Sequence, residues 1–199
     1  MWMQLRHDRL ADFVAAAEAI GFRHIELSHV VTSQMLAGFS AVPDLVRTLH
    51  HPCPNDGSIP ELSNPDEGER ARAVRAALRT LEWAAELGAT AVVLHLGIAA
   101  NLDPRWENGL RARWLAGQSE TPAFATLAQT IREMRAARVE PFLAAARRSL
   151  AELVPHAERL ALQLGLENGE WVASIPSLDE LIDLLADFPA STVGAWLDT

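Results

Sequence analysis

Short apolar runs alternate with longer segments of helical pattern along almost the whole chain, and this alternation constrains the fold most strongly. Each run has the length of a buried strand, whereas the segments between them repeat apolar residues at helical spacing. Strands separated by helices favour a parallel sheet with right-handed crossovers. We therefore expect an α/β fold, either a barrel or an open doubly wound sheet, with five strands over residues 24–27, 45–50, 91–95, 164–167 and 193–198.

The segments between these runs show helix signals of different strength. Helices are expected over 8–20, from an Asn64 cap to Gly88, over 122–138 and 141–164, and after a capping box at Ser177 whose helix turns Leu181, Ile182 and Leu185 inward. Residues 98–120 are expected to form a polar loop. Its residues Trp106 and Trp114 are interpreted either as a lid over a sugar ring or as part of a packed Ω-loop. No internal repeat or linker is visible, so the chain is expected to form a single domain over 1–199.

A polar side chain able to bind a ligand stands at or near the end of every predicted strand. These residues are Glu26, His50 with His51 beside it, His95, Glu167 and Asp198. In parallel α/β folds, ligands bind at the carboxyl ends of the strands. Imidazoles and carboxylates that converge there suit a divalent metal, and they also suit proton transfer beside a polarised carbonyl group.

Each of these residues also has a simpler interpretation when taken alone. Glu26 could accept a hydrogen bond from a loop, and either His50 or His51 could be an ordinary loop histidine. His95 is a stronger candidate, because the buried run Ala91–Leu94 precedes it and Gly97 follows. A carboxylate such as Glu167 at the end of an apolar strand is costly to bury without a cationic partner. The other histidines, at positions 7, 24, 29 and 156, are expected to be surface or packing residues.

Composition limits the partners and the compartment. The net charge of −9 repels phosphate backbones and therefore disfavours nucleic-acid binding. The single cysteine, Cys53, excludes an intrachain disulfide and fits a reducing compartment. The chain shows neither a signal-peptide pattern nor an apolar run near the ~20 residues of a membrane span. A cytoplasmic protein without membrane partners is expected.

Five segments, in order along the chain, resemble the xylose isomerase-like TIM-barrel superfamily. This superfamily contains sugar (phosphate) isomerases and epimerases, and also the endonuclease IV type of apurinic-site nuclease. The resemblance implies that Glu167 is a metal ligand and acid/base and that Asp198 is a second metal ligand. It implies that Glu26, His50, His95 and Asn168 organise the site or contact substrate, with His95 also catalytic. The segments that carry it are residues 21–27, 49–53, 92–97, 166–169 and 197–199.

The chain departs from the superfamily pattern at both ends. Seven residues precede the first predicted helix without reading as a strand, and the sequence stops at Thr199, directly after Asp198. We therefore expect a partial (β/α)8 barrel that lacks the first strand and the last two strands, since a complete barrel has ~250 residues. Such a fragment or truncated product would expose sheet edges that favour association, including homo-oligomers. It would also bind metal weakly and have little or no activity.

Three functions follow from these features. The first is a sugar (phosphate) isomerase or epimerase, in which a divalent ion (Mn, Mg, Co or Zn) stabilises an enediolate and Glu167 moves the proton. The second is an apurinic-site endonuclease with a zinc cluster, which the negative net charge disfavours. The third is a non-catalytic barrel remnant that serves as an interaction module.

Overall fold

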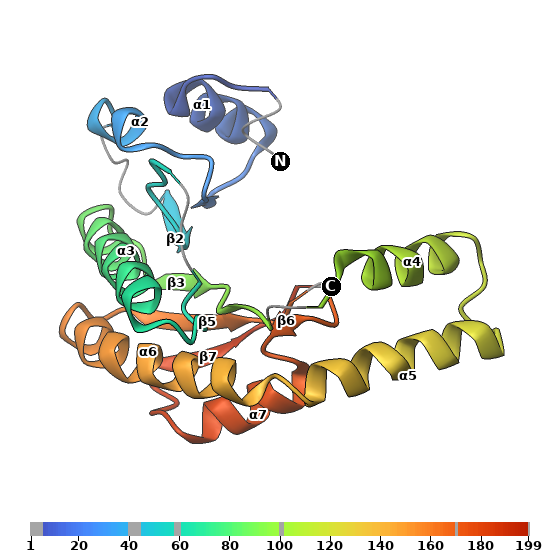
Figure 1. Cartoon of the computed structure of the whole chain (residues 1–199). Helices are drawn as coiled ribbons and strands as arrows, with labels where there is room; N and C mark the ends of the chain where they lie inside the picture. Colours follow the sequence, from blue (N-terminus) through green and yellow to red (C-terminus); the bar gives the residue numbers. More distant parts are fainter. Residues whose placement is uncertain (1–5, 40–44, 58–60, 100–101, 170, 199) are drawn as a thin grey trace.

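The computed structural model describes residues 6–39, 45–57, 61–99, 102–169 and 171–198. Its main feature is a five-stranded sheet in which every neighbouring pair is parallel and the spatial order follows the chain order (Figure 1). This arrangement confirms the predicted α/β fold and is that of a partial barrel. The strands are β1 (Ile25–Leu27), β2 (Val46–His50), β3 (Ala91–Leu94), β5 (Gln163–Glu167) and β7 (Val193–Trp196).

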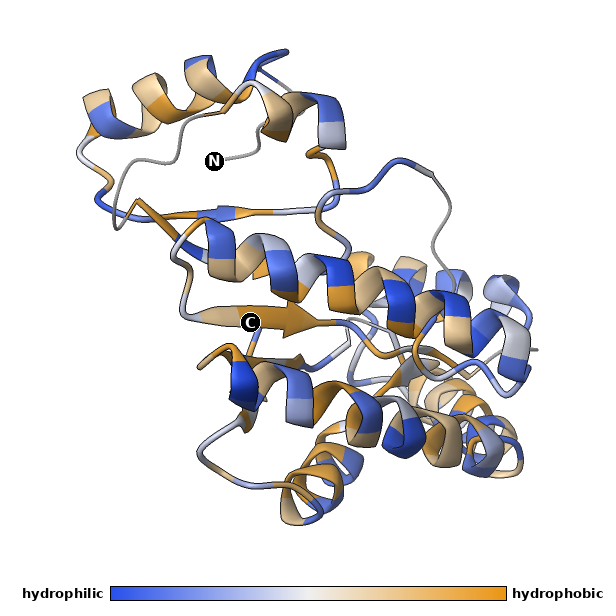
Figure 2. Cartoon of the chain, turned by 90° about the vertical axis from the view of Figure 1, so that its left-hand side faces the viewer, coloured by the Kyte–Doolittle hydropathy of each residue, from blue (hydrophilic) through white to orange (hydrophobic). Residues whose placement is uncertain are grey.

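Helices connect the strands as crossovers and pack against the outer face of the sheet (Figure 1). The leucines that point toward them, such as Leu49, Leu94 and Leu164, are almost completely buried. Figure 2 shows the same division, with hydrophobic strands between helices that alternate hydrophobic and hydrophilic segments. The helices between strands are α2 (Ser33–Ala37), α3 (Glu67–Glu86), α6 (Glu140–Arg159) and α7 (Leu178–Ala186), and α1 (Leu10–Ile20) precedes β1.

Strand register explains why the polar residues share one region. Parallel partners point to the same face of a sheet, and the register pairs Glu26 with Thr48, His50 with Val93, and Glu167 with Trp196. Glu26, His50 and Glu167 therefore project from the face opposite the helix-packed leucines. His95 lies one residue beyond β3, and Asp198 lies two residues beyond β7.

The expectation of a polar loop over 98–120 was wrong, because most of this segment is helical. Helix α4 (Pro104–Leu115) and helix α5 (Pro122–Ala136) form a pair that projects from the body of the domain (Figure 1). The Asp103 side chain accepts a hydrogen bond from the Arg105 amide, and proline begins the helix. Helix α4 buries none of its residues, so its sequence lacks the apolar period that marks the other helices.

A second, short sheet was also not foreseen. Strand β4 (Gly97–Ile98) pairs antiparallel with strand β6 (Ser174–Ile175). Gly97 has a φ of +132°, and a Cβ atom built on it would lie 2.5 Å from Ser63 Oγ and 2.6 Å from Glu61 Cβ. Glycine is required there because the backbone conformation is closed to other residues and the neighbouring space is filled.

Two smaller expectations at helices were wrong, and one falls largely outside the described residues. Asp66, not Asn64, caps α3, since its side chain accepts from the Glu69 amide. Ile182 is 63% exposed on α7, where Leu181 and Leu184 form the inner face. Thr199 and residues 1–5 are not described, so the missing first strand stays a prediction.

Within the described ranges, no helix combines the length and apolar character that a membrane span requires.

Candidate metal centre and active site

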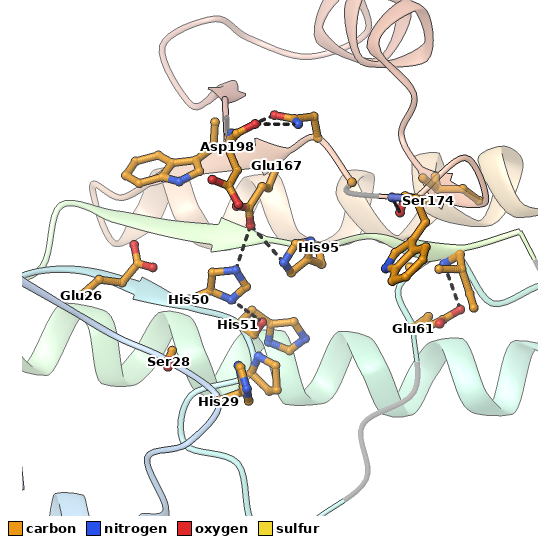
Figure 3. A pocket seen from close by; sticks show the side chains of 18 of the residues that line it. Glu26, Ser28, His29, His50, His51, Glu61, His95, Glu167, Ser174 and Asp198 are labelled. Carbon is orange, nitrogen blue, oxygen red and sulfur yellow. Dashed lines mark hydrogen bonds and ion pairs between the residues drawn. The ribbon is translucent and has the colours of Figure 1, made fainter. Parts of the chain in front are cut away.

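Two histidines and one carboxylate from three neighbouring strand ends meet at a single oxygen atom (Figure 3). Glu167 Oε2 lies 2.9 Å from His50 Nε2 and 3.1 Å from His95 Nε2. One ligand atom from each of the three residues lies within 4.8 Å of the others, the spacing of a group that can hold one metal ion. The His50 and Glu167 side chains are 13% and 7% exposed, whereas His95 is 54% exposed and stands at the rim.

The hydrogen bond at the far side of His50 indicates what this cluster is built to hold. His50 Nδ1 lies 3.0 Å from the His51 carbonyl oxygen. A carbonyl oxygen only accepts, so Nδ1 carries the proton and the Nε2 of a neutral His50 is an acceptor. That acceptor faces a carboxylate oxygen at 2.9 Å, which is repulsive unless a cation or an added proton lies between them. Histidines that bind metals through Nε2 while Nδ1–H donates to a carbonyl show this same arrangement.

His95 is suited to act as a neutral imidazole. Burial lowers its pKa, and the positive charge that His50 can carry adds to this effect, while the nearby Glu167 carboxylate partly opposes it. The two imidazole rings are 4.7 Å apart between centroids. A neutral imidazole at pH 7 offers a lone pair to a metal ion or to a substrate proton.

The structure separates the two histidines that the sequence left as alternatives. His50 reaches Glu167, whereas His51 is 4% exposed and packs away from it, with Nδ1 3.2 Å from Thr80 Oγ1. Burial, followed by the effects of His50 and other nearby cationic groups, lowers the pKa of His51 to about 3. His51 is therefore neutral, and it packs beneath the Glu167 cluster while also lining the cavity.

Two hydrogen bonds between Asn168 and Asp198 join the ends of β5 and β7. The Asn168 side chain accepts from the Asp198 amide at 2.9 Å and donates to the Asp198 carbonyl at 3.0 Å. The side-chain amide of Asn168 thus hydrogen-bonds to the backbone of Asp198. The Asp198 side chain lies beside Glu167 (Figure 3) but is outside the group of ligand atoms that surrounds Glu167 Oε2. Its predicted role as a metal ligand stays a prediction.

Glu26 lies in the same cavity but apart from the cluster (Figure 3). Its carboxylate accepts a hydrogen bond from Thr48 Oγ1 at 2.7 Å across the β1–β2 pair. The structure thus places Glu26 both as a hydrogen-bond acceptor within the sheet and as a group facing the cavity.

These residues line a cavity of roughly 900 Å³, within the size range of small-molecule sites. His24 and His29 also line it, and both are exposed, as expected for surface residues. The indoles on its wall belong to Trp171 and Trp196. Trp106 and Trp114 are 40% and 61% exposed on α4 and are not among the described residues that line the cavity. The lid interpretation of those two tryptophans is therefore not supported.

Sequence reasoning also missed Glu61, which faces the cavity from the loop before α3. Burial raises the pKa of its carboxyl group, although a hydrogen bond from the Ile98 amide at 3.2 Å opposes the shift. Among the described strands none ends next to Glu61, so a search of strand ends could not find it. The conformation of Gly97, which brings β4 against Glu61, was the available signal.

The comparisons with known proteins agree on the fold. The sequence model of the family described as xylose isomerase-like TIM barrel matches residues 14–199. No curated protein sequence matches the chain.

Similar solved structures include a D-tagatose 3-epimerase-like protein (19% identity, TM-score 0.61) and 3-keto-D-glucoside 4-epimerase from E. coli (14%, 0.62). Another is the TTHB071 protein of Thermus thermophilus soaked with zinc chloride (21%, 0.58). Each match covers 96% of this chain but only 61%, 64% and 62%, respectively, of the other chain. The chain thus spans about three fifths of the length of the structures it resembles.

Proposed function

Because the chain belongs to the xylose isomerase-like TIM barrel family, we propose that it carries a divalent-metal and acid–base centre of the kind used to isomerise or epimerise sugars or sugar phosphates. The observation that carries this proposal is the meeting of His50 Nε2, His95 Nε2 and Glu167 Oε2 around one point, with His50 in the tautomer that leaves Nε2 bare. The activity of the whole protein is part of the proposal, since the related structures are longer.

The donor set favours some metals over others. Two imidazole nitrogens and one carboxylate oxygen suit Zn²⁺, Co²⁺ or Mn²⁺, whereas Mg²⁺ prefers oxygen ligands. When bound, such an ion would polarise the carbonyl group of a substrate and make the neighbouring C–H bond more acidic. His50, His95 and Glu167 would hold it, and Asp198, which lines the same cavity, is a further candidate.

Glu167 is the proposed proton carrier. Its carboxylate is nearly buried, so it acts in a water-poor environment where a charge interacts strongly with its surroundings. In the proposed reaction it takes the proton from the carbon beside the carbonyl group. Returning it to the neighbouring carbon would isomerise the sugar, whereas epimerisation would require a second acid that protonates the same carbon from the opposite face. With Nε2 facing the ion, His95, at the exposed rim, would donate a hydrogen bond to a substrate oxygen through Nδ1.

The two other functions have less support. The cavity is lined by the carboxylates of Glu26, Glu61, Glu167 and Asp198, which would repel a DNA backbone. This argues against the apurinic-site nuclease. A non-catalytic remnant would not explain the tautomer of His50, nor why His50 and His95 both approach the Glu167 carboxylate.

Solvent exchange tests the proposal. The chain is incubated in D₂O with a panel of ketoses and their phosphates, separately with Zn²⁺, Co²⁺, Mn²⁺ and Mg²⁺, and NMR follows deuterium entering beside the carbonyl group. We expect metal-dependent exchange that Glu167→Gln lowers by about 10²–10⁴-fold. The control Glu82→Gln, on the exposed face of α3, should leave it unchanged. Failure to exchange with every metal and sugar would contradict the proposal.

A further inference from the structure

A short turn after Glu167 places the indole of Trp171 in the cavity wall. The Trp171 amide donates to Ser174 Oγ at 3.2 Å, and the Ser174 amide donates to the Trp171 carbonyl at 3.0 Å. A Cβ atom on Gly169 would lie 1.8 Å from Ser174 Cβ, so the chain can fold back this closely only at glycine. Trp171 is 37% exposed and lines the cavity. In Figure 3, Ser174 marks this end of the cavity, beyond His95 when seen from His50.

Helix α4 holds this turn with two side chains. The Glu107 carboxylate accepts a hydrogen bond from the Ala173 amide at 2.7 Å. The Arg111 guanidinium lies over the Trp171 ring, 5.2 Å from its centroid, in a cation–π contact. Glu107 and Arg111 are four residues apart and therefore share one side of the helix. Since α4 buries none of its residues, these contacts give the helix a role other than core packing.

Helix α5 fixes the same turn from its other end. Arg135 Nη2 donates to the Ser174 carbonyl at 2.8 Å, while the guanidinium forms two 2.6 Å bonds to the Glu180 carboxylate. Arg135 is 7% exposed. The projecting α4–α5 pair thus contacts the turn at Trp171, Ala173 and Ser174, which sets the position of the Trp171 indole in the cavity wall.

The lining of the cavity indicates what the indole contacts. Trp196, 36% exposed, is a second indole on the wall, on the strand next to Glu167. The acidic groups are the carboxylates of Glu26, Glu61, Glu167 and Asp198. The 17 Lys and Arg residues are all arginines within the described ranges, and none of them lines the cavity, whose basic side chains are the imidazoles of five histidines. Indole faces pack against the C–H face of a sugar ring, carboxylates accept hydrogen bonds from hydroxyl groups, and carboxylates repel phosphate.

We infer that Trp171 is a substrate-contacting residue that stacks on the apolar face of an unphosphorylated sugar, and that Glu107 and Arg111 are its positioning residues. This inference rests on the proposed function, since it assumes that the cavity receives a sugar. It adds the substrate class and a subsite beyond the His50–His95–Glu167 cluster.

Calorimetric titration of the full chain, loaded with Mn²⁺, tests the subsite without requiring turnover. The probes are D-fructose and D-fructose 6-phosphate. We expect D-fructose to bind at least tenfold more tightly than its phosphate. Trp171→Ala should weaken D-fructose binding about tenfold, the equivalent of ~1.4 kcal/mol, and Trp171→Phe should retain most of it. Arg111→Leu should weaken it about threefold, because the indole keeps its environment but loses its cation–π partner.

Two controls separate stacking from folding and from metal binding. Trp114→Ala removes an exposed indole from α4, the helix that carries Arg111. It should change neither the affinity for D-fructose nor that for its phosphate. Mn²⁺ affinity should stay within twofold in every variant, because Trp171 is not among the residues around Glu167 Oε2. If Trp171→Ala lowers the temperature of the unfolding midpoint, the D-fructose affinities of Trp171→Phe and Arg111→Leu are compared instead.

The outcomes distinguish the inference from the proposed function. If the unaltered chain binds neither sugar, both fail. If it binds D-fructose and the Trp171 and Arg111 variants bind equally well, the subsite is wrong while the proposed function stands. Tighter binding of the phosphate would overturn the substrate class.

Discussion

Replacing Arg135 by methionine is expected to destabilise the chain by about 3–5 kcal/mol. Arg135 and Glu180 form an ion pair whose side chains are only 9% and 15% exposed. Two N–O contacts of 2.6 Å and a third bond to the Ser174 carbonyl complete it. Burial raises the pKa of Glu180, but hydrogen bonds from Arg135 and from the Ser177 amide outweigh this and lower it overall. The carboxylate therefore stays charged after Arg135 is removed.

The magnitude follows from what each partner loses. Removing one member of a buried pair leaves an uncompensated charge and typically costs 3–5 kcal/mol. Glu180 would keep its bond to the Ser177 amide, which places the expected cost toward the lower part of that range. Arg135 Nε has no hydrogen-bond partner among the described residues, so the pair is already imperfectly satisfied. The double variant Arg135→Met/Glu180→Gln should therefore recover about 1–2 kcal/mol relative to the sum of the single variants.

Urea unfolding followed by circular dichroism measures these differences. The matched control is Arg147→Met, which breaks the exposed Arg147–Asp187 pair, 2.9 Å long and 38% and 48% exposed. Exposed pairs contribute about 0–1 kcal/mol, so the control should barely shift the midpoint. Equal, small effects of Arg135→Met and Arg147→Met would refute the reasoning, because burial would then make no difference to the cost.

Two further predictions concern the surroundings of the site. Gly97→Ala should cost about 1–3 kcal/mol in urea unfolding, since φ is +132° and a Cβ atom would meet Ser63 and Glu61; Gly38→Ala, with open space around it, should change stability by less than about 0.5 kcal/mol. His51, with its pKa lowered to about 3, stays neutral in the folded chain while the unfolded chain takes up a proton below about pH 6.5. Its contribution to stability should therefore be complete above about pH 6.5 and decline toward pH 3, by at most about 1.4 kcal/mol per pH unit. His51→Gln should flatten this part of the stability profile, and an unchanged slope would contradict the assignment.

The main sheet could be predicted because its strands are short, apolar and separated by helices. Buried strands such as Ala91–Leu94 have a length and β-branched content that few other elements share. The polar residues at their ends followed from the geometry of parallel sheets. His50, His95 and Glu167 therefore could be expected to approach one another before their distances were known.

Other parts depend on contacts that a single segment does not reveal. Helix α4 escaped detection because it buries no side chain, although Asp103 and Pro104 are ordinary helix-start residues. Glu61 and Trp171 reach the cavity through loops whose course depends on close backbone approaches at Gly97 and Gly169. The choice of His50 over His51 required the register of β2, because adjacent residues on a strand point to opposite faces.

Metal titration tests the central claim most directly. Calorimetry with Zn²⁺ and Mn²⁺ at pH 7 should show one ion bound per chain. His50→Ala, His95→Ala and Glu167→Ala should each weaken binding by at least about tenfold, while Asp198→Ala reports whether that carboxylate joins the site. The absence of a bound ion would contradict the account, and so would an affinity that survives the loss of both histidines.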